Sequence, residues 1–72
     1  MSDSIQRFSI VLRQLREERG WSQEHLAERA DLNRSYLGEV ERGHAIPSLI
    51  TVFKLASALE IRLSSFISRC EH

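Results

Sequence analysis

Residues 21–43 read WSQEHLAERADLNRSYLGEVERG, and this stretch carries the signals for two short helices joined by a tight turn. Ser22 is a favourable N-cap, because its hydroxyl can accept a hydrogen bond from a free backbone N–H of the first helical turn. Trp21 and Leu26 flank it at the spacing of a hydrophobic staple. We therefore expect a helix over residues 23–30, ended at Asp31, a residue type that tolerates the left-handed conformation of a sharp turn.

The same arrangement recurs eleven residues later in the same stretch. Asn33 is the next candidate N-cap, and Leu32 and Leu37 repeat the staple spacing around it. Gly43 follows as a natural helix-terminating residue. The second helix is expected over residues 34–42, which makes the pair a candidate helix-turn-helix.

The flanking sequence predicts three more helices and no strands. Apolar residues at helical spacing indicate a first helix over residues 4–19, ended by Gly20. Ser48 is a candidate N-cap for a fourth helix, and a short fifth helix is expected over residues 63–70. The predicted fold is all-α, a compact five-helix domain over residues 1–72. The apolar faces expected to point inward are Ile5, Phe8, Val11, Leu12 and Leu15 in the first helix, and Leu49, Val52, Phe53, Ala56 and Leu59 in the fourth.

A chain of 72 residues is short for building a stable core. Domains of this size usually gain stability from disulfides, a metal or oligomerisation. The single cysteine, Cys70, excludes an internal disulfide and a cysteine-rich zinc site. Oligomerisation remains, so a homodimer is expected. With no secretory signal or membrane-spanning run, the expected compartment is the cytoplasm, without membrane association.

The charge distribution limits how this chain could bind nucleic acid. The formal net charge is zero, and residues 20–47 carry three Arg against five acidic residues, a balance of −2. A generally basic surface, the usual signature of a nucleic-acid-binding domain, is therefore absent. Any DNA contact by the candidate helix-turn-helix must depend on a few placed Arg residues, neutral polar groups and helix N-termini.

The segment Trp21-Ser22-Gln23-Glu24-His25-Leu26-Ala27 resembles the phage-repressor and Cro-like (XRE) helix-turn-helix family. The resemblance continues through residues 32–38, 40–43, 47–49 and 55–56, and covers roughly residues 8–67. The short length and the Arg-Ser-Tyr-Leu segment at 34–37 look like restriction–modification controller proteins. Asp31 and Glu60 are departures, since the family usually has Gly at both positions.

The resemblance implies a compact repressor-like fold and a DNA-binding site on the two helices. In this motif, residues at the start of the second helix read base edges, which assigns that role to Arg34 and, less specifically, Ser35. Arg can bridge guanine O6 and N7. Phosphate contacts are expected from Gln23, Arg42 and His44. Asn33 is first a cap, and a base or phosphate contact is its secondary role.

Three further residues of the second helix are candidates with two interpretations each. Tyr36 could pack or place its hydroxyl on a phosphate. Gly38 costs helix stability, which either close approach to DNA or close helix packing would explain. Glu39 could accept a hydrogen bond from cytosine N4, although an acid near phosphates is unfavourable.

The family resemblance also suggests one internal contact and one interface. An Arg16–Glu41 ion pair would fix the recognition helix on the first helix. Leu63 and Phe66 match the family's fifth-helix pattern and are expected mainly in the core. Together with the adjacent Ile67, they mark the fifth helix as the expected dimerisation element.

The predicted function is a transcriptional regulator that binds double-stranded DNA as a homodimer on a pseudo-palindromic operator. No catalytic residue, metal site or cofactor is expected, because the sequence lacks a Gly-rich phosphate loop, metal-spaced His/Cys residues and a Ser-His-acid set. Two alternatives stay open: an antitoxin-type module that holds a toxin, or the DNA-binding part of a larger regulator. RNA polymerase is a further candidate partner.

Overall fold

The computed structural model describes residues 2–71, and over this range the chain forms five α-helices and no strands. They are α1 (Ser2–Glu18), α2 (Gln23–Arg29), α3 (Arg34–Glu41), α4 (Leu49–Ala58) and α5 (Leu63–Cys70). The predicted all-α fold is confirmed, and α1 begins two residues earlier than the sequence pattern indicated. None of the described helices is long and apolar enough to cross a membrane.

Three helices begin at the predicted N-caps. Ser22, Asn33 and Ser48 each have extended backbone angles, and each side-chain oxygen accepts a hydrogen bond from the backbone N–H three residues on. Each bond satisfies a donor that the start of a helix leaves free. Arg62 makes no such side-chain bond at the start of α5. The start of α5 therefore depends on packing.

The first four helices end in the same kind of turn. The second residue after each helix adopts a positive φ: 72° at Gly20, 56° at Asp31, 76° at Gly43 and 55° at Glu60. The N–H of the following residue then reaches back five positions, which is the Schellman pattern. Asp31 and Glu60 thus adopt the conformation that glycine favours. The bonds are Trp21 to Arg16, Leu32 to Ala27, His44 to Glu39 and Ile61 to Ala56, at 2.8–3.2 Å.

One apolar core joins all five helices. Its fully buried side chains include Leu12, Leu26, Leu37, Leu55, Leu59 and Phe66. The Phe66 ring stacks on Phe8 with 5.1 Å between ring centroids, which attaches α5 to α1. Half-buried residues of the loops and of α5, including Cys70, pack around this cluster.

The predicted inward face of α4 is partly wrong. Leu49 and Phe53 are exposed, whereas Thr51 and Leu55 are buried beside Val52, Ala56 and Leu59. The helix is apolar around most of its circumference, so periodicity alone left its rotation undetermined. The neighbours of α4 decide it, since α2 and α5 pack against its Leu55 side.

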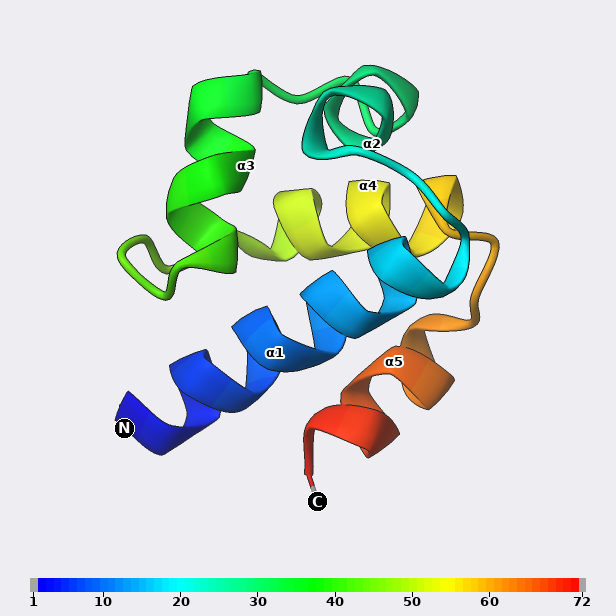
Figure 1. Ribbon diagram of the computed structural model, residues 1–72. Helices are drawn as coiled ribbons and strands as arrows, with labels where there is room; N and C mark the ends of the chain where they lie inside the picture. The colour runs from blue at the N-terminus through cyan, green and yellow to red at the C-terminus, as the bar shows by residue number, and fades with distance from the viewer. Residues whose placement is uncertain (1, 72) are drawn as a thin grey trace.

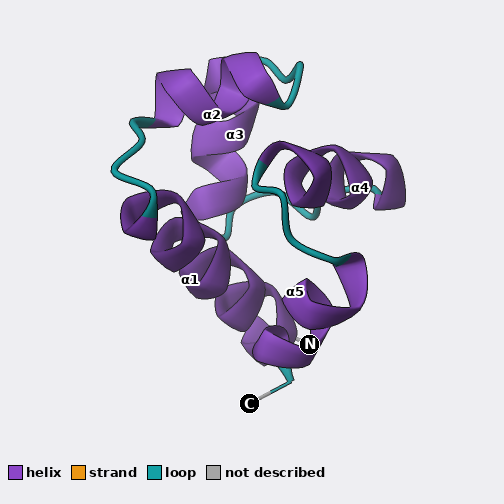
Figure 2. Cartoon of the chain, turned by 90° about the vertical axis from the view of Figure 1, so that its right-hand side faces the viewer, coloured by secondary structure: helices purple, strands orange, loops and turns teal. Residues whose placement is uncertain are grey.

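The arrangement leaves α2 and α3 together at one end of the molecule. Figures 1 and 2 show this pair at the top, α1 and α4 crossing beneath it, and α5 at the opposite end beside α1. In Figure 2, α1 and α4 lie on opposite sides. The outer face of α3 is therefore free to meet a partner.

Candidate nucleic-acid interface

The first turn of α3 presents polar side chains to solvent. Arg34 and Ser35 are exposed, while Leu37 and Val40 on the other side of the helix are buried in the core. Asn33 is exposed too, with its side-chain oxygen used by the cap. The helix thus has one face that anchors it and one that can contact a ligand.

An open depression of ≈ 440 Å³ lies between the start of α2 and the outer face of α3. Seven of the nine predicted DNA-binding residues line it together: Gln23, Arg34, Ser35, Tyr36, Gly38, Glu39 and Arg42. The other two, Asn33 and His44, lie outside this lining, at the two ends of α3. Residues predicted separately from the sequence therefore form one continuous surface.

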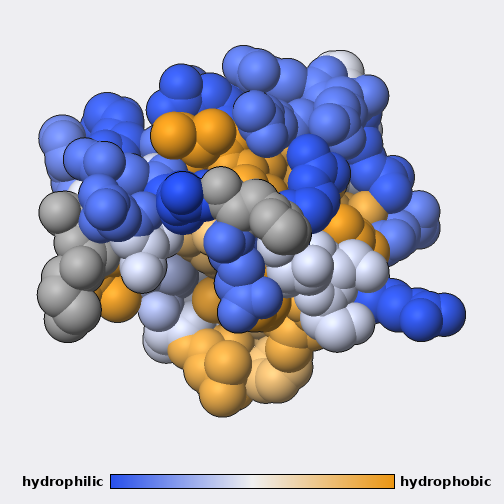
Figure 3. All heavy atoms as spheres, turned by 90° about the horizontal axis from the view of Figure 1, so that it is seen from below, coloured by the Kyte–Doolittle hydropathy of each residue, from blue (hydrophilic) through white to orange (hydrophobic). Residues whose placement is uncertain are grey.

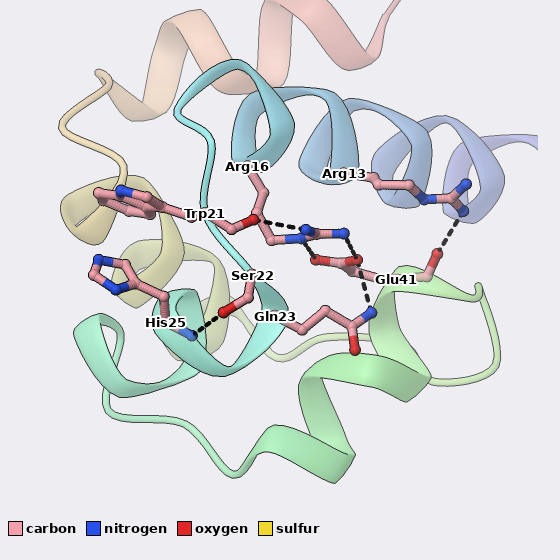
Figure 4. A network of polar contacts seen from close by, with 7 residues as sticks. All are labelled: Arg13, Arg16, Trp21, Ser22, Gln23, His25 and Glu41. Atoms are coloured by element: carbon pink, nitrogen blue, oxygen red, sulfur yellow. Dashed lines mark hydrogen bonds and ion pairs between the residues drawn. The ribbon is translucent and has the colours of Figure 1, made fainter.

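Glu41 is the structural centre behind this surface. Its carboxylate accepts two hydrogen bonds from the Arg16 guanidinium, at 2.8 and 3.0 Å, and Figure 4 shows the two groups face to face. The Glu41 side chain is only 2% exposed and that of Arg16 13%. The hydrogen bond to Glu41 raises the pKa of Arg16 above its already high ordinary value. The predicted Arg16–Glu41 ion pair is confirmed.

Two further hydrogen bonds connect Glu41 to α2 and α1. Gln23 Nε2 donates to Glu41 Oε1 at 3.0 Å, and the Arg13 guanidinium donates to the Glu41 backbone oxygen at 3.2 Å (Figure 4). Arg16 also donates to the Trp21 carbonyl at 2.8 Å. One buried carboxylate therefore ties α1, α2 and α3 together, which fixes the angle between the two helices of the motif.

The Gln23–Glu41 contact was not predicted from the sequence. Gln23 was assigned only a phosphate contact, yet one N–H of its amide is occupied by Glu41. The second amide N–H is the one left to donate elsewhere. Eighteen residues separate the two positions, so only the packing of α2 on α3 brings them together.

Gly38 lies on the depression. A Cβ built there would have as its nearest neighbours side-chain atoms only, Arg42 Nη1 at 3.3 Å and Gln23 Oε1 at 3.7 Å. No backbone of another helix is among these nearest atoms, which disfavours close helix packing as the reason for glycine. The missing side chain instead keeps the depression open between Gln23 and Arg42.

Glu39 occupies the outer rim next to two potential cations. Its carboxylate pairs with Arg42 one turn on, and His44 Nδ1 lies 3.7 Å from it. All three side chains are substantially exposed, so water screens these contacts. In the free protein, Glu39 therefore offsets part of the charge that Arg42 could offer to a phosphate.

Tyr36 packs, which is the first of the two interpretations that the sequence left open. Its ring packs partly against the core, and its hydroxyl oxygen lies 3.3 Å from Thr51 Oγ1. The same residue lines the depression. Tyr36 thus links α3 to the start of α4 while its edge remains part of the candidate interface.

The predicted dimerisation residues separate in the structure. Phe66 is fully buried, which confirms its expected place in the core and leaves its side chain unavailable to the interface for which it was also a candidate. Leu63 is half-buried and packs on the same core. Ile67 is 42% exposed and remains available on the surface of α5. Within residues 2–71, no group of three His, Cys, Asp or Glu is placed to hold a metal ion.

The comparisons with known proteins agree with this architecture. A family model described as helix-turn-helix matches residues 12–66. The chain is 38% identical over 72 residues to the control protein C.MunI of Mycoplasma sp, covering 99% of this chain and 97% of that protein. It is 40% identical over 67 residues to the transcriptional regulator SutR of Escherichia coli K12, covering 92% of this chain. That match spans only 38% of SutR.

Solved structures include a close neighbour. The restriction–modification controller protein C.AhdI of Aeromonas hydrophila superposes with a TM-score of 0.83 and 45% identity, over 86% of this chain and 94% of that one. The family match covers most of the chain. Both controller proteins align with this chain over nearly their whole length. The chain belongs to the XRE-type helix-turn-helix family of DNA-binding transcriptional regulators, a class of regulators and not of enzymes.

Proposed function

We propose that this protein binds a pseudo-palindromic DNA operator as a homodimer, with α3 of each copy in a major groove. The observation that carries the proposal is the depression beside the exposed first turn of α3. The depression brings neutral polar groups, two arginines and Glu39 together from α2 and α3, and the opposite side of α3 is buried in the core. An α-helix fits the major groove of B-DNA, where base edges differ in their donors and acceptors.

The proposed roles follow from where each side chain lies. Arg34, exposed at the start of α3, is the candidate for reading guanine, and Ser35 is the adaptable second contact. Glu39 is a candidate for accepting from cytosine N4 only after Arg42 has turned from it toward a phosphate. The remaining candidates contact the DNA backbone and set the register; they are Gln23, Asn33, Tyr36, Arg42 and His44.

Two identical copies explain why the operator would be a pseudo-palindrome. A two-fold dimer presents the same helix twice, so the half-sites mirror the symmetry of the protein. Their centres would lie about one helical turn, roughly 34–36 Å, apart. In a larger regulator the same domain would bind in the same way, with activities added by the rest of the chain.

The direct test is selection of bound sequences from random double-stranded DNA by the purified full chain. The expected outcome is an enriched inverted repeat whose two halves are about 10 base pairs apart. Enrichment of a single unrepeated site would contradict the dimeric operator. Failure to enrich any sequence would remove the proposal and favour the alternative of an antitoxin-type module.

A further inference from the structure

Among the described residues that line the depression beside α3, Glu39 is the only acid. Its side chain is 46% exposed, and it lies on the outer face of α3, one turn after Ser35 and almost one turn before Arg42. The proposed function turns this face toward the major groove, between strands that carry a negative charge on every phosphate. A carboxylate at this point therefore opposes binding wherever the DNA offers it no hydrogen-bond donor.

In the free protein, two neighbours beyond the end of α3 compensate the Glu39 carboxylate. One of its oxygens pairs with the Arg42 guanidinium, and the other lies 3.7 Å from His44 Nδ1. Because these side chains are exposed, the pairing is weak and can open. A phosphate that attracts Arg42 competes with Glu39 for the same guanidinium. Contact with DNA thus weakens the pairing of Glu39 just when phosphates approach it.

The rest of the molecule does not mask this repulsion. The chain carries ten basic and ten acidic side chains, so its overall field does not attract DNA. Figure 3 shows strongly hydrophilic side chains spread over much of the lower face, not gathered in one place. Salt at 0.1 M screens charges over about 10 Å, so an acid at the interface opposes binding more than an acid elsewhere.

The base edges of the major groove differ in whether they can compensate a carboxylate. Cytosine presents the N4 amino group, a donor with no acceptor beside it on the same base. Adenine presents an amino group next to the N7 acceptor, guanine two acceptors, and thymine an acceptor and a methyl group. A carboxylate on α3 is therefore satisfied best opposite cytosine and is opposed most by guanine and thymine.

From these observations we infer that Glu39 is a specificity-determining residue that acts mainly against wrong DNA sites. It holds Arg42 away from phosphates and repels any groove that lacks a cytosine amino group opposite it. Specificity is a difference between affinities, so a penalty at wrong sites serves as well as an extra contact at the right one. This role rests on the proposed function, and it explains how a chain without a basic surface could tell its operator from other DNA.

Fluorescence anisotropy titrations on a scrambled duplex test this role directly. Glu39→Ala keeps a strong helix former and is expected to bind scrambled DNA about fivefold tighter or more, because each copy loses a repulsive charge and frees Arg42. A pair that only stabilised α3 would give no such gain. Glu28→Ala removes an exposed acid of α2 outside the depression and is the matched control, expected to change the affinity less than about twofold.

An unchanged affinity of Glu39→Ala for scrambled DNA would overturn the inference. An equal gain for Glu28→Ala would overturn it too, because any lost acid would then have the same effect.

Glu39→Gln tests the base that Glu39 reads. A glutamine can donate to N7 and accept from N6 of adenine, so selection from random DNA should replace cytosine by adenine at one position of each half-site. Unchanged base preference at every position would contradict the role of Glu39. If the wild-type chain itself enriches no sequence, the proposed function fails; if it enriches an operator that Glu39→Gln also prefers, only the role of Glu39 fails.

Discussion

Arg34 differs from the other arginines of the motif in what surrounds it. Arg16 is committed to buried Glu41, and Arg42 pairs with Glu39. Among the described residues, Arg34 forms no hydrogen bond or ion pair through its side chain, and it is exposed at the start of α3. A free, exposed guanidinium at this point is ready to form two parallel hydrogen bonds with a guanine.

Arg34→Ala should weaken binding to the selected operator by about 1–3 kcal/mol, a loss of roughly 5- to 150-fold. Binding to scrambled DNA should change much less, because the non-specific term comes from phosphate contacts. Fluorescence anisotropy titrations on both duplexes measure the two effects. Arg34→Lys is the control: it keeps the charge but loses the bidentate geometry, so it should lose specificity only. Equal losses on both duplexes would show that Arg34 contacts phosphate.

At the scale of the elements, the motif is held as a rigid unit by contacts that lie behind it. The Glu41 carboxylate receives Arg16 from α1 and Gln23 from α2. Burial makes such a carboxylate costly without its partners, but two strong donors compensate it. Because the contacts cross between helices, the angle that α3 presents to DNA depends on them.

Glu41→Ala should lower the free energy of unfolding by about 3 kcal/mol, since it leaves the Arg16 guanidinium with little solvent and no counter-ion. For a domain of this size, that corresponds to a fall in Tm of more than about 10 °C. Thermal unfolding followed by circular dichroism measures it. Glu39→Ala, which removes an exposed acid from the same helix, should cost under about 1 kcal/mol. Unchanged stability together with unchanged DNA affinity for Glu41→Ala would show that the Arg16–Glu41 pair does not hold α3 in position.

At the scale of the whole molecule, the charge balance sets how strongly salt should affect binding. The chain carries ten basic and ten acidic side chains, so no general positive field attracts DNA. The cations on the candidate interface are mainly Arg34 and Arg42, two per chain. Specificity then depends on the geometry of a few contacts.

The binding constant of the dimer should accordingly fall with salt with a log–log slope of only about −2, because Arg42 of each chain neutralises one phosphate at about 0.9 each while Arg34 contacts a base. Titrations between roughly 50 and 200 mM salt determine the slope. Arg42→Ala removes this phosphate contact from each chain and should bring the slope close to zero. A wild-type slope steeper than about −8 would mean that basic residues outside the depression dominate binding.

The local signals of this sequence determined the order and bounds of the helices. Ser22, Asn33 and Ser48 cap where predicted, because a cap involves groups within one helical turn. Asp31 turns the chain as expected, and Glu60 does the same without a glycine. The Arg16–Glu41 pair was predictable only from the family resemblance, since the two residues lie 25 positions apart.

Only the tertiary structure decided which sides of the helices are free. α4 is apolar on several faces, and its packing on α2 and α5 buries Leu55 and leaves Leu49 and Phe53 exposed. Phe66 was expected in the core from the family pattern, but its stacking partner, Phe8 of α1, is known only from the fold. Sequence periodicity predicts that a helix has an apolar face. Burial of that face requires a partner surface, and the partner exists only after the chain has folded.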